Sequence, residues 1–146
     1  MVNMLIEAIC DKLTALFEDT VVYTEKVPQN FTTPSFYIRC INYSDDILLF
    51  DNRRKIAVFD ITYFPAENSL TAQEEMNSVA VKLRENMHFI NVGDNILKSY
   101  DTDINKDNSN DCEELHFIVS YKYILFKEKD DVKMEVLKER NDVNGK

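Results

Sequence analysis

Between residues 115 and 126 every second side chain is apolar, and this alternation constrains the fold more than any other feature of the sequence. Successive side chains of a β-strand point to opposite faces of the sheet, so the pattern predicts a long strand with one buried face. The apolar series consists of Leu115, Phe117, Val119, Tyr121, Tyr123 and Leu125. Because the second series is mixed, other elements are expected to cover only the first face.

Two segments carry apolar residues at steps of three and four, which is the spacing of an amphipathic helix. The first covers about residues 2–18 and the second about residues 70–87. Thr71 and Glu74 have the spacing of a capping box, in which each side chain bonds to the other residue's free backbone amide. Each segment has a single apolar face, so both helices are expected to pack on the sheet.

Aromatic and β-branched residues predict further strands at 35–43, 56–64 and 96–104, and a short extended piece at 21–24. The apolar runs 47–50 and 56–64 flank the polar residues 51–54, a pattern typical of a β-hairpin. Residues 105–112 are polar and predict a flexible loop. This order of elements predicts an α+β fold, with a mostly antiparallel sheet of four to six strands and two amphipathic helices packed on it.

The length of 146 residues fits one domain, which we place at residues 1–127. Residues 128–146 lack core-forming side chains and predict a charged C-terminal tail. The first residues include Glu7 and Asp11 and do not resemble a signal peptide, and no apolar run approaches the roughly 20 residues that cross a bilayer. Synthesis in a cytoplasm without a membrane partner is therefore expected.

The composition disfavours two classes of function. Only 2 glycines are present, which argues against a glycine-rich phosphate loop, and the net charge of −9 argues against tight binding of nucleic acid. The three cysteines, Cys10, Cys40 and Cys112, are widely spaced and predict reduced thiols rather than disulfides.

No catalytic, cofactor or metal site is predicted. The residues Asp103, Asn105, Asp107, Asp111 and Glu114 fit ligand positions of a helix-loop-helix calcium loop. However, Asn108 stands where that loop needs glycine, and the flanking segments are predicted strands, so an acidic solvated loop is the preferred interpretation. His88 and His116 are far apart and neither has a second ligand at metal-like spacing. Nothing in the spacing favours a cysteine nucleophile beside His116.

Arg39 and Asp60 lie inside runs that otherwise look buried. Since an unpaired buried charge is costly, these side chains are expected to pair with each other, to pair with another subunit, or to face solvent.

Five segments together resemble a known family of assembly proteins. They are MLIEAICDKLTALF, VYTEKVPQNFTTPSFYIRCIN, FDITYFP, MNSVAVKLRENMHFI and LHFIVSYKYILF. Over about residues 1–127 the chain resembles the tail terminators of phages and phage-like particles of Gram-positive bacteria. The resemblance implies a structural virion protein, not an enzyme, that forms a homohexameric ring at the head-tail junction. It also implies contacts with the tail tube protein, with the head-tail connector protein and, in contractile tails, with the sheath, while DNA passes through the lumen without specific binding.

Three segments are candidates for these contacts. The polar arm 25–33 and the hairpin 45–54 are expected to project and to order on neighbouring subunits, while the segment 101–114, with six acids against one lysine, would repel DNA phosphates in a lumen. The subunit-interface candidates are Glu25, Lys26, Gln29, Asn30, Phe31, Asp45, Asp46, Phe50, Arg53 and Arg54. The lumen-facing candidates are Asp101, Asp103, Asp107, Asp111, Glu113 and Glu114.

Two rival functions remain open on the sequence. A head-tail connector or completion protein would differ only in the ring that it touches. A small cytosolic ligand-binding α+β domain belongs to another class, and the composition is compatible with it. An enzyme is disfavoured because no nucleophile, base or metal constellation is present in the sequence pattern.

Overall fold

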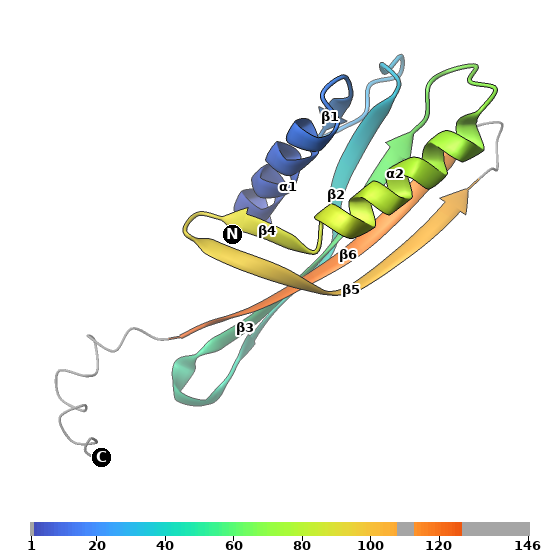
Figure 1. Ribbon diagram of the computed structural model, residues 1–146. Coiled ribbons are helices and arrows are strands. Elements are labelled where there is room, and N and C mark those ends of the chain that lie inside the picture. The colour runs from blue at the N-terminus through green and yellow to red at the C-terminus, as the bar shows by residue number, and fades with distance from the viewer. Residues whose placement is uncertain (1, 108–112, 127–146) are drawn as a thin grey trace. The chain divides into compact units, whose positions relative to one another are not determined.

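The computed structural model describes residues 2–107 and 113–126 and confirms the α+β prediction (Figure 1). Two α-helices accompany a mostly antiparallel sheet of six strands. The elements are α1 (Val2–Leu16), β1 (Val21–Tyr23), β2 (Ser35–Ile47), the 3-10 turn η1 (Leu49–Asp51), β3 (Arg53–Phe64), α2 (Ala72–Asn86), β4 (Phe89–Val92), β5 (Asn95–Asp107) and β6 (Glu114–Leu125).

The strand order is β1-β2-β3-β6-β5-β4. The pairs β4–β5 and β5–β6 are antiparallel, whereas β1 pairs with β2 in parallel. In the β5–β6 pair Asp107 lies opposite Glu114, and Asn105 lies opposite His116. Directly opposite residues of an antiparallel pair point to the same face, so this register decides which polar side chains meet.

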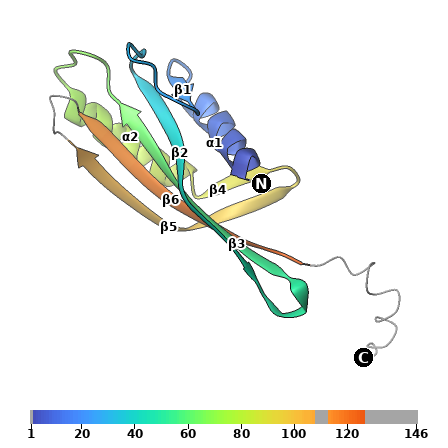
Figure 2. The same ribbon diagram turned by 180° about the vertical axis from the view of Figure 1, so that it is seen from behind.

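The chain divides into two compact units. The first comprises residues 1–43 and 56–122, and the second comprises residues 44–55 and 123–146, of which 44–55 and 123–126 are described. Both views show α1 and α2 on the same face of the sheet within the first unit (Figures 1 and 2). Neither helix in the described part of the chain is long and apolar enough to span a membrane.

The core of the first unit lies between the helices and the sheet. The helices contribute Leu5, Ile9, Leu13, Met76, Val79 and Leu83, and the strands contribute Phe36, Ile38, Phe59, Ile61, Leu115, Phe117, Val119 and Tyr121. Each large apolar side chain buried here stabilises the fold by about 1.5–3 kcal/mol. The Tyr121 hydroxyl donates a hydrogen bond of 2.7 Å to the carbonyl of Met87, and burial raises the pKa of this hydroxyl, which therefore stays protonated.

The alternation that predicts β6 is confirmed only in its first two thirds. Leu115 to Tyr121 are buried at every second position, but Tyr123 is half-buried and Leu125 is 41% exposed. Both belong to the second unit, whose described residues include no α-helix that would cover a sheet face.

Three local predictions need correction. The apolar run 47–50 does not form a separate strand, because β2 continues to Ile47 and the following residues make the turn itself. Residues 105–107 belong to β5 rather than to a loop, since they pair with β6. The capping box is also wrong: Thr71 is the N-cap residue, but its side chain makes no capping hydrogen bond.

The entry to α2 is held by Glu75 instead. Its carboxylate accepts hydrogen bonds from the Ala66 amide at 3.0 Å, from the Ser69 hydroxyl at 3.3 Å and from the Tyr63 hydroxyl. Burial and the adjacent Glu75 carboxylate raise the pKa of Tyr63, so Tyr63 remains a donor. These bonds fix the loop before α2 without the reciprocal contact that the sequence predicts.

Candidate functional site

The turn between β2 and β3 has a conformation that its residues do not favour. The Leu48 amide donates to the Asn52 carbonyl at 2.6 Å and closes the loop, while Phe50 and Asp51 have φ values of 59° and 62°. Residues with a Cβ rarely adopt this left-handed region, and Gly or Asn normally occupies it. A bulky aromatic side chain at such a position points to a role other than forming the turn.

The same turn exposes its apolar side chains to water. Ile47 is 67% exposed, Leu49 is 79% exposed and Phe50 is 87% exposed. In the described residues, six of the fifteen exposed large hydrophobic side chains belong to the second unit, and these three form its hairpin tip. A cluster of exposed apolar side chains, unlike a single one, is typical of an interaction surface. We call Ile47, Leu49 and Phe50 the apolar tip.

Ion pairs stiffen the strands below the apolar tip. Asp45 contacts Arg53 at 3.2 Å and Lys55 at 3.4 Å, and Asp46 contacts Arg54 at 3.1 Å. Slight desolvation alone would raise the pKa of the Asp45 carboxyl, but the hydrogen bonds and charges of Arg53 and Lys55 outweigh it and lower that pKa. Four predicted interface residues are thus paired within the hairpin itself, where they hold the apolar tip.

A second polar arrangement lies on the sheet of the first unit. Asp60 is 4% exposed and accepts hydrogen bonds from Arg39 Nη2 and from Thr62 Oγ1, each at 3.2 Å. Its two carboxylate oxygens both lie 3.1 Å from His116 Nδ1. Of the alternatives open for Arg39 and Asp60, the structure shows pairing with each other. The Arg39 side chain is 55% exposed, so its head remains largely hydrated.

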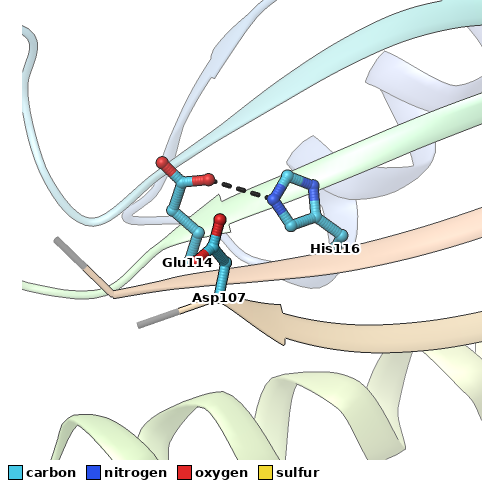
Figure 3. Close-up of side chains that lie close together, drawn as sticks. All are labelled: Asp107, Glu114 and His116. Atoms are coloured by element: carbon cyan, nitrogen blue, oxygen red, sulfur yellow. Dashed lines mark hydrogen bonds and ion pairs between the residues drawn. The ribbon is translucent and has the colours of Figure 1, made fainter. Parts of the chain in front are cut away.

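His116 connects this buried carboxylate to two acidic side chains at the ends of β5 and β6. Its Nε2 lies 3.0 Å from Glu114 Oε1, as the close-up shows (Figure 3). Ligand atoms of Asp107, Glu114 and His116 all lie within 4.8 Å of one another. We call these three residues the β5–β6 triad. The helical and loop spacings typical of metal ligands do not predict this triad, because its His116 and Glu114 share a face as residues two apart on a strand.

The lumen-facing candidates occupy different positions. Asp101, Asp103 and Asp107 are exposed along β5, and Glu113 accepts a hydrogen bond from Gln73 Nε2 at 3.1 Å. The remaining two are Glu114, in the β5–β6 triad, and Asp111, which lies outside the described residues.

The polar arm is tied to the body of the first unit at several points. The Thr32 amide donates to the Tyr23 hydroxyl at 3.1 Å, and the Tyr37 hydroxyl donates to the Glu25 carbonyl at 3.2 Å. Phe31 packs against Phe64 with ring centroids 4.7 Å apart. Of the predicted interface residues in the arm, Glu25, Lys26, Gln29 and Asn30 are exposed. Phe31 and Glu113, predicted for different roles, both line one open groove of about 630 Å³.

The cysteines show no arrangement for nucleophilic catalysis in the described residues. Burial raises the pKa of the Cys40 thiol, against a weaker opposing hydrogen bond to the Asn42 carbonyl, so Cys40 is a poor nucleophile at neutral pH. Cys112 lies outside the described residues, and Cys10 is a free thiol on α1.

A sequence model of a known family matches nearly the whole described chain. Its description is "Phage tail terminator protein", and the match covers residues 4–133. No curated protein matches the sequence. One solved structure, whose name gives no function, aligns over 88% of this chain and 97% of its own, with 10% identity and a TM-score of 0.45. This likeness is too weak to carry an argument about fold or function.

Proposed function

The chain belongs to the phage tail terminator family, and from this premise we propose that it caps the tail tube as a homohexameric ring, ends tube polymerisation and provides the docking surface for the head connector. The family is structural rather than catalytic, and it belongs to the tail of the virion. Capping requires one face that matches the end of the tube and an opposite face that recruits no further tube subunit.

The observation that carries this proposal is the apolar tip. A protein that works alone gains nothing from Phe50 at 87% exposure in a left-handed conformation, because the side chain is neither buried nor relaxed. A neighbouring subunit or tube ring that covers the tip would remove this apolar surface from water. Burial of one such aromatic side chain stabilises an interface by about 1.5–3 kcal/mol. The ion pairs of Asp45 and Asp46 hold the two strands of the hairpin together, so the apolar tip is available to such a partner.

The acidic row of β5 supports a lumen-facing role. Asp101, Asp103 and Asp107 follow each other at two-residue steps or multiples of two, so their side chains share one face. Six such rows around a ring would repel DNA phosphates and let the genome slide without adhering. Reversal of charge at Asp101 and Asp103 should therefore slow DNA passage, and unchanged passage would remove support for this orientation.

The experiment is a tube-growth assay with the cognate tail tube protein. Wild-type chain added during polymerisation should shorten the tubes and leave a ring at one end in electron micrographs. Leu49→Ser should abolish this effect. Leu70→Ser removes a leucine of the first unit that is even more exposed, at 101%, and this variant should cap normally. Tube lengths that ignore the wild-type protein would refute capping. A ring found on the head connector and not on the tube would support the connector alternative.

A further inference from the structure

We propose that the β5–β6 triad of Asp107, Glu114 and His116 binds a divalent transition-metal cation of the zinc class. The register of the sheet creates this site. Asp107 lies directly opposite Glu114, and His116 follows Glu114 by two residues, so all three side chains extend from the same face of the strand pair. One nitrogen and two carboxylate donors therefore meet at the ends of two adjacent strands.

The spacing of the donor atoms suits one ion after a small adjustment. They lie within 4.8 Å of one another. Tetrahedral zinc ligands at about 2.1 Å from the metal are about 3.4 Å apart, so the side chains need to close by roughly an ångström. The Glu114 and His116 side chains are 28% and 23% exposed, and Asp107 is exposed, which leaves a path for the ion. Three protein donors would leave the fourth position to water or to a further ligand.

The buried carboxylate of Asp60 prepares His116 as a metal ligand. Nδ1 lies 3.1 Å from both carboxylate oxygens of Asp60 and 3.1 Å from Thr62 Oγ1. Because a carboxylate only accepts hydrogen bonds, the tautomer with its proton on Nδ1 satisfies Asp60 and leaves the lone pair on Nε2. Nε2 points toward the carboxylate of Glu114, a second member of the triad. A histidine that ligates a metal usually donates its other ring N–H to a carboxylate in this way, which orients the ring and raises its basicity.

In that tautomer the contact between Nε2 and Glu114 calls for a bound cation or a second proton. With the proton on Nδ1, both Nε2 and the Glu114 oxygen are acceptors, yet they lie 3.0 Å apart. Lys106, the cation next to Asp107, does not supply the charge, because its amino group contacts Gln73 and Asn77 of α2. A cation between the two acceptors resolves the repulsion. A second proton on the imidazole is the competing solution, and zinc titration together with NMR of His116 separates the two.

The donor set selects the class of metal. Imidazole suits zinc, nickel, copper and cobalt, whereas calcium prefers six to eight oxygen ligands. The proposed site is therefore not the calcium loop that residues 103–114 resemble. The bound ion would link β5 to β6 at the position where Asp107 and Glu114 are paired.

The test is isothermal titration of zinc chloride and calcium chloride into tag-free, chelator-treated full-length protein. We expect one zinc ion per chain and no comparable calcium binding. Asp107→Asn and Glu114→Gln should each weaken zinc binding at least tenfold, while Asp103→Asn, which removes the same charge from the same face of β5, should not. Asp60→Asn should weaken binding by about 10–100-fold although Asp60 is not a ligand.

Cobalt provides a second readout that excludes the thiols. The cobalt-loaded protein should absorb in the visible range without a thiolate charge-transfer band, because no cysteine belongs to the triad. His116→Ala should lose the visible band, and a thermal unfolding curve will show whether this variant is folded. The proposal is overturned if zinc does not bind, if Asp107→Asn binds zinc as tightly as Asp103→Asn, or if calcium binds more tightly than zinc. Absence of zinc binding together with a doubly protonated His116 in NMR spectra would assign the contact to the proton. None of these outcomes depends on tube capping.

Discussion

Replacement of Phe50 by asparagine should change the stability of the free chain and its assembly in opposite directions. Phe50 has a φ of 59° and is 87% exposed, so it makes little packing that a substitution would lose. The left-handed conformation costs an ordinary residue about 1–2 kcal/mol, and asparagine reduces that cost because its short side chain bonds locally. Phe50→Asn should therefore raise the free energy of unfolding by up to about 1 kcal/mol, or about 2–4 °C in Tm for a chain of this size.

The same substitution should weaken assembly. An aromatic side chain that passes from nearly full exposure to burial contributes about 2 kcal/mol per contact, which corresponds to about 30-fold in the dissociation constant of each contact. Every subunit of a closed ring would repeat this loss. The variant is thus expected to be slightly more stable as a free chain and much less effective as a cap.

Two assays measure the two effects. Thermal unfolding followed by circular dichroism reports stability, and tube length against added protein in the growth assay reports capping. Leu70→Asn is the control, because Leu70 is 101% exposed and its φ is not left-handed. It should change neither measurement. A Phe50→Asn variant that is several degrees less stable would show that the side chain packs in the free chain. A variant that caps at the wild-type concentration would refute the role of the apolar tip.

Further predictions concern the polar contacts. Asp60→Ala should lower the free energy of unfolding by about 3 kcal/mol, because it removes a buried acceptor of charged hydrogen bonds. Arg39→Ala should lower it by less than about 1 kcal/mol, since Arg39 is largely exposed. Urea unfolding compares the two variants, and equal losses would contradict this difference in burial. Glu75→Ala should cost about 1–3 kcal/mol and Thr71→Ala almost nothing, and a larger effect of Thr71→Ala in the same assay would restore the capping box. Asp45→Asn should lower the Tm at pH 7, and the Tm difference should shrink as the pH falls below about 4: the pKa of Asp45 is lowered in the fold, so its stabilisation is present above the unfolded value of about 3.9 and is lost as the pH falls through the folded value. A Tm difference that does not decrease as the pH is lowered would show that charge is not the cause.

The helices, the main strands and the fold class follow from local patterns in the sequence. Apolar spacing along residues 2–18 and 70–87 predicts α1 and α2, and alternation along 115–126 predicts β6, because burial on one face imposes the period of the secondary structure. The aromatic and β-branched runs likewise predict the central strands. These patterns depend only on residues close together in the sequence, so one sequence is enough to detect them.

Local patterns failed where a tertiary contact competes with a local one. Thr71 and Glu74 have the spacing of a capping box, but Glu75 reaches back to the Ala66 amide and holds the loop instead. The apolar run 47–50 predicts a strand, but only Ile47 belongs to β2 and the residues after it form the turn. Turns are usually polar, so local sequence rules do not explain this composition. The proposed interface at the apolar tip would account for that composition.

Which polar residues meet depends on long-range strand pairing. The β5–β6 register brings Asp107 opposite Glu114, and the adjacency of β3 and β6 brings Asp60 to His116 across 56 residues of sequence. Strand register is set by contacts between residues far apart in the sequence. A register shift of one residue would turn every side chain of the strand to the other face. The spacing of residues within one strand does not specify the register. The packing of both helices on one sheet face fixes it, because only one register buries the apolar face under them.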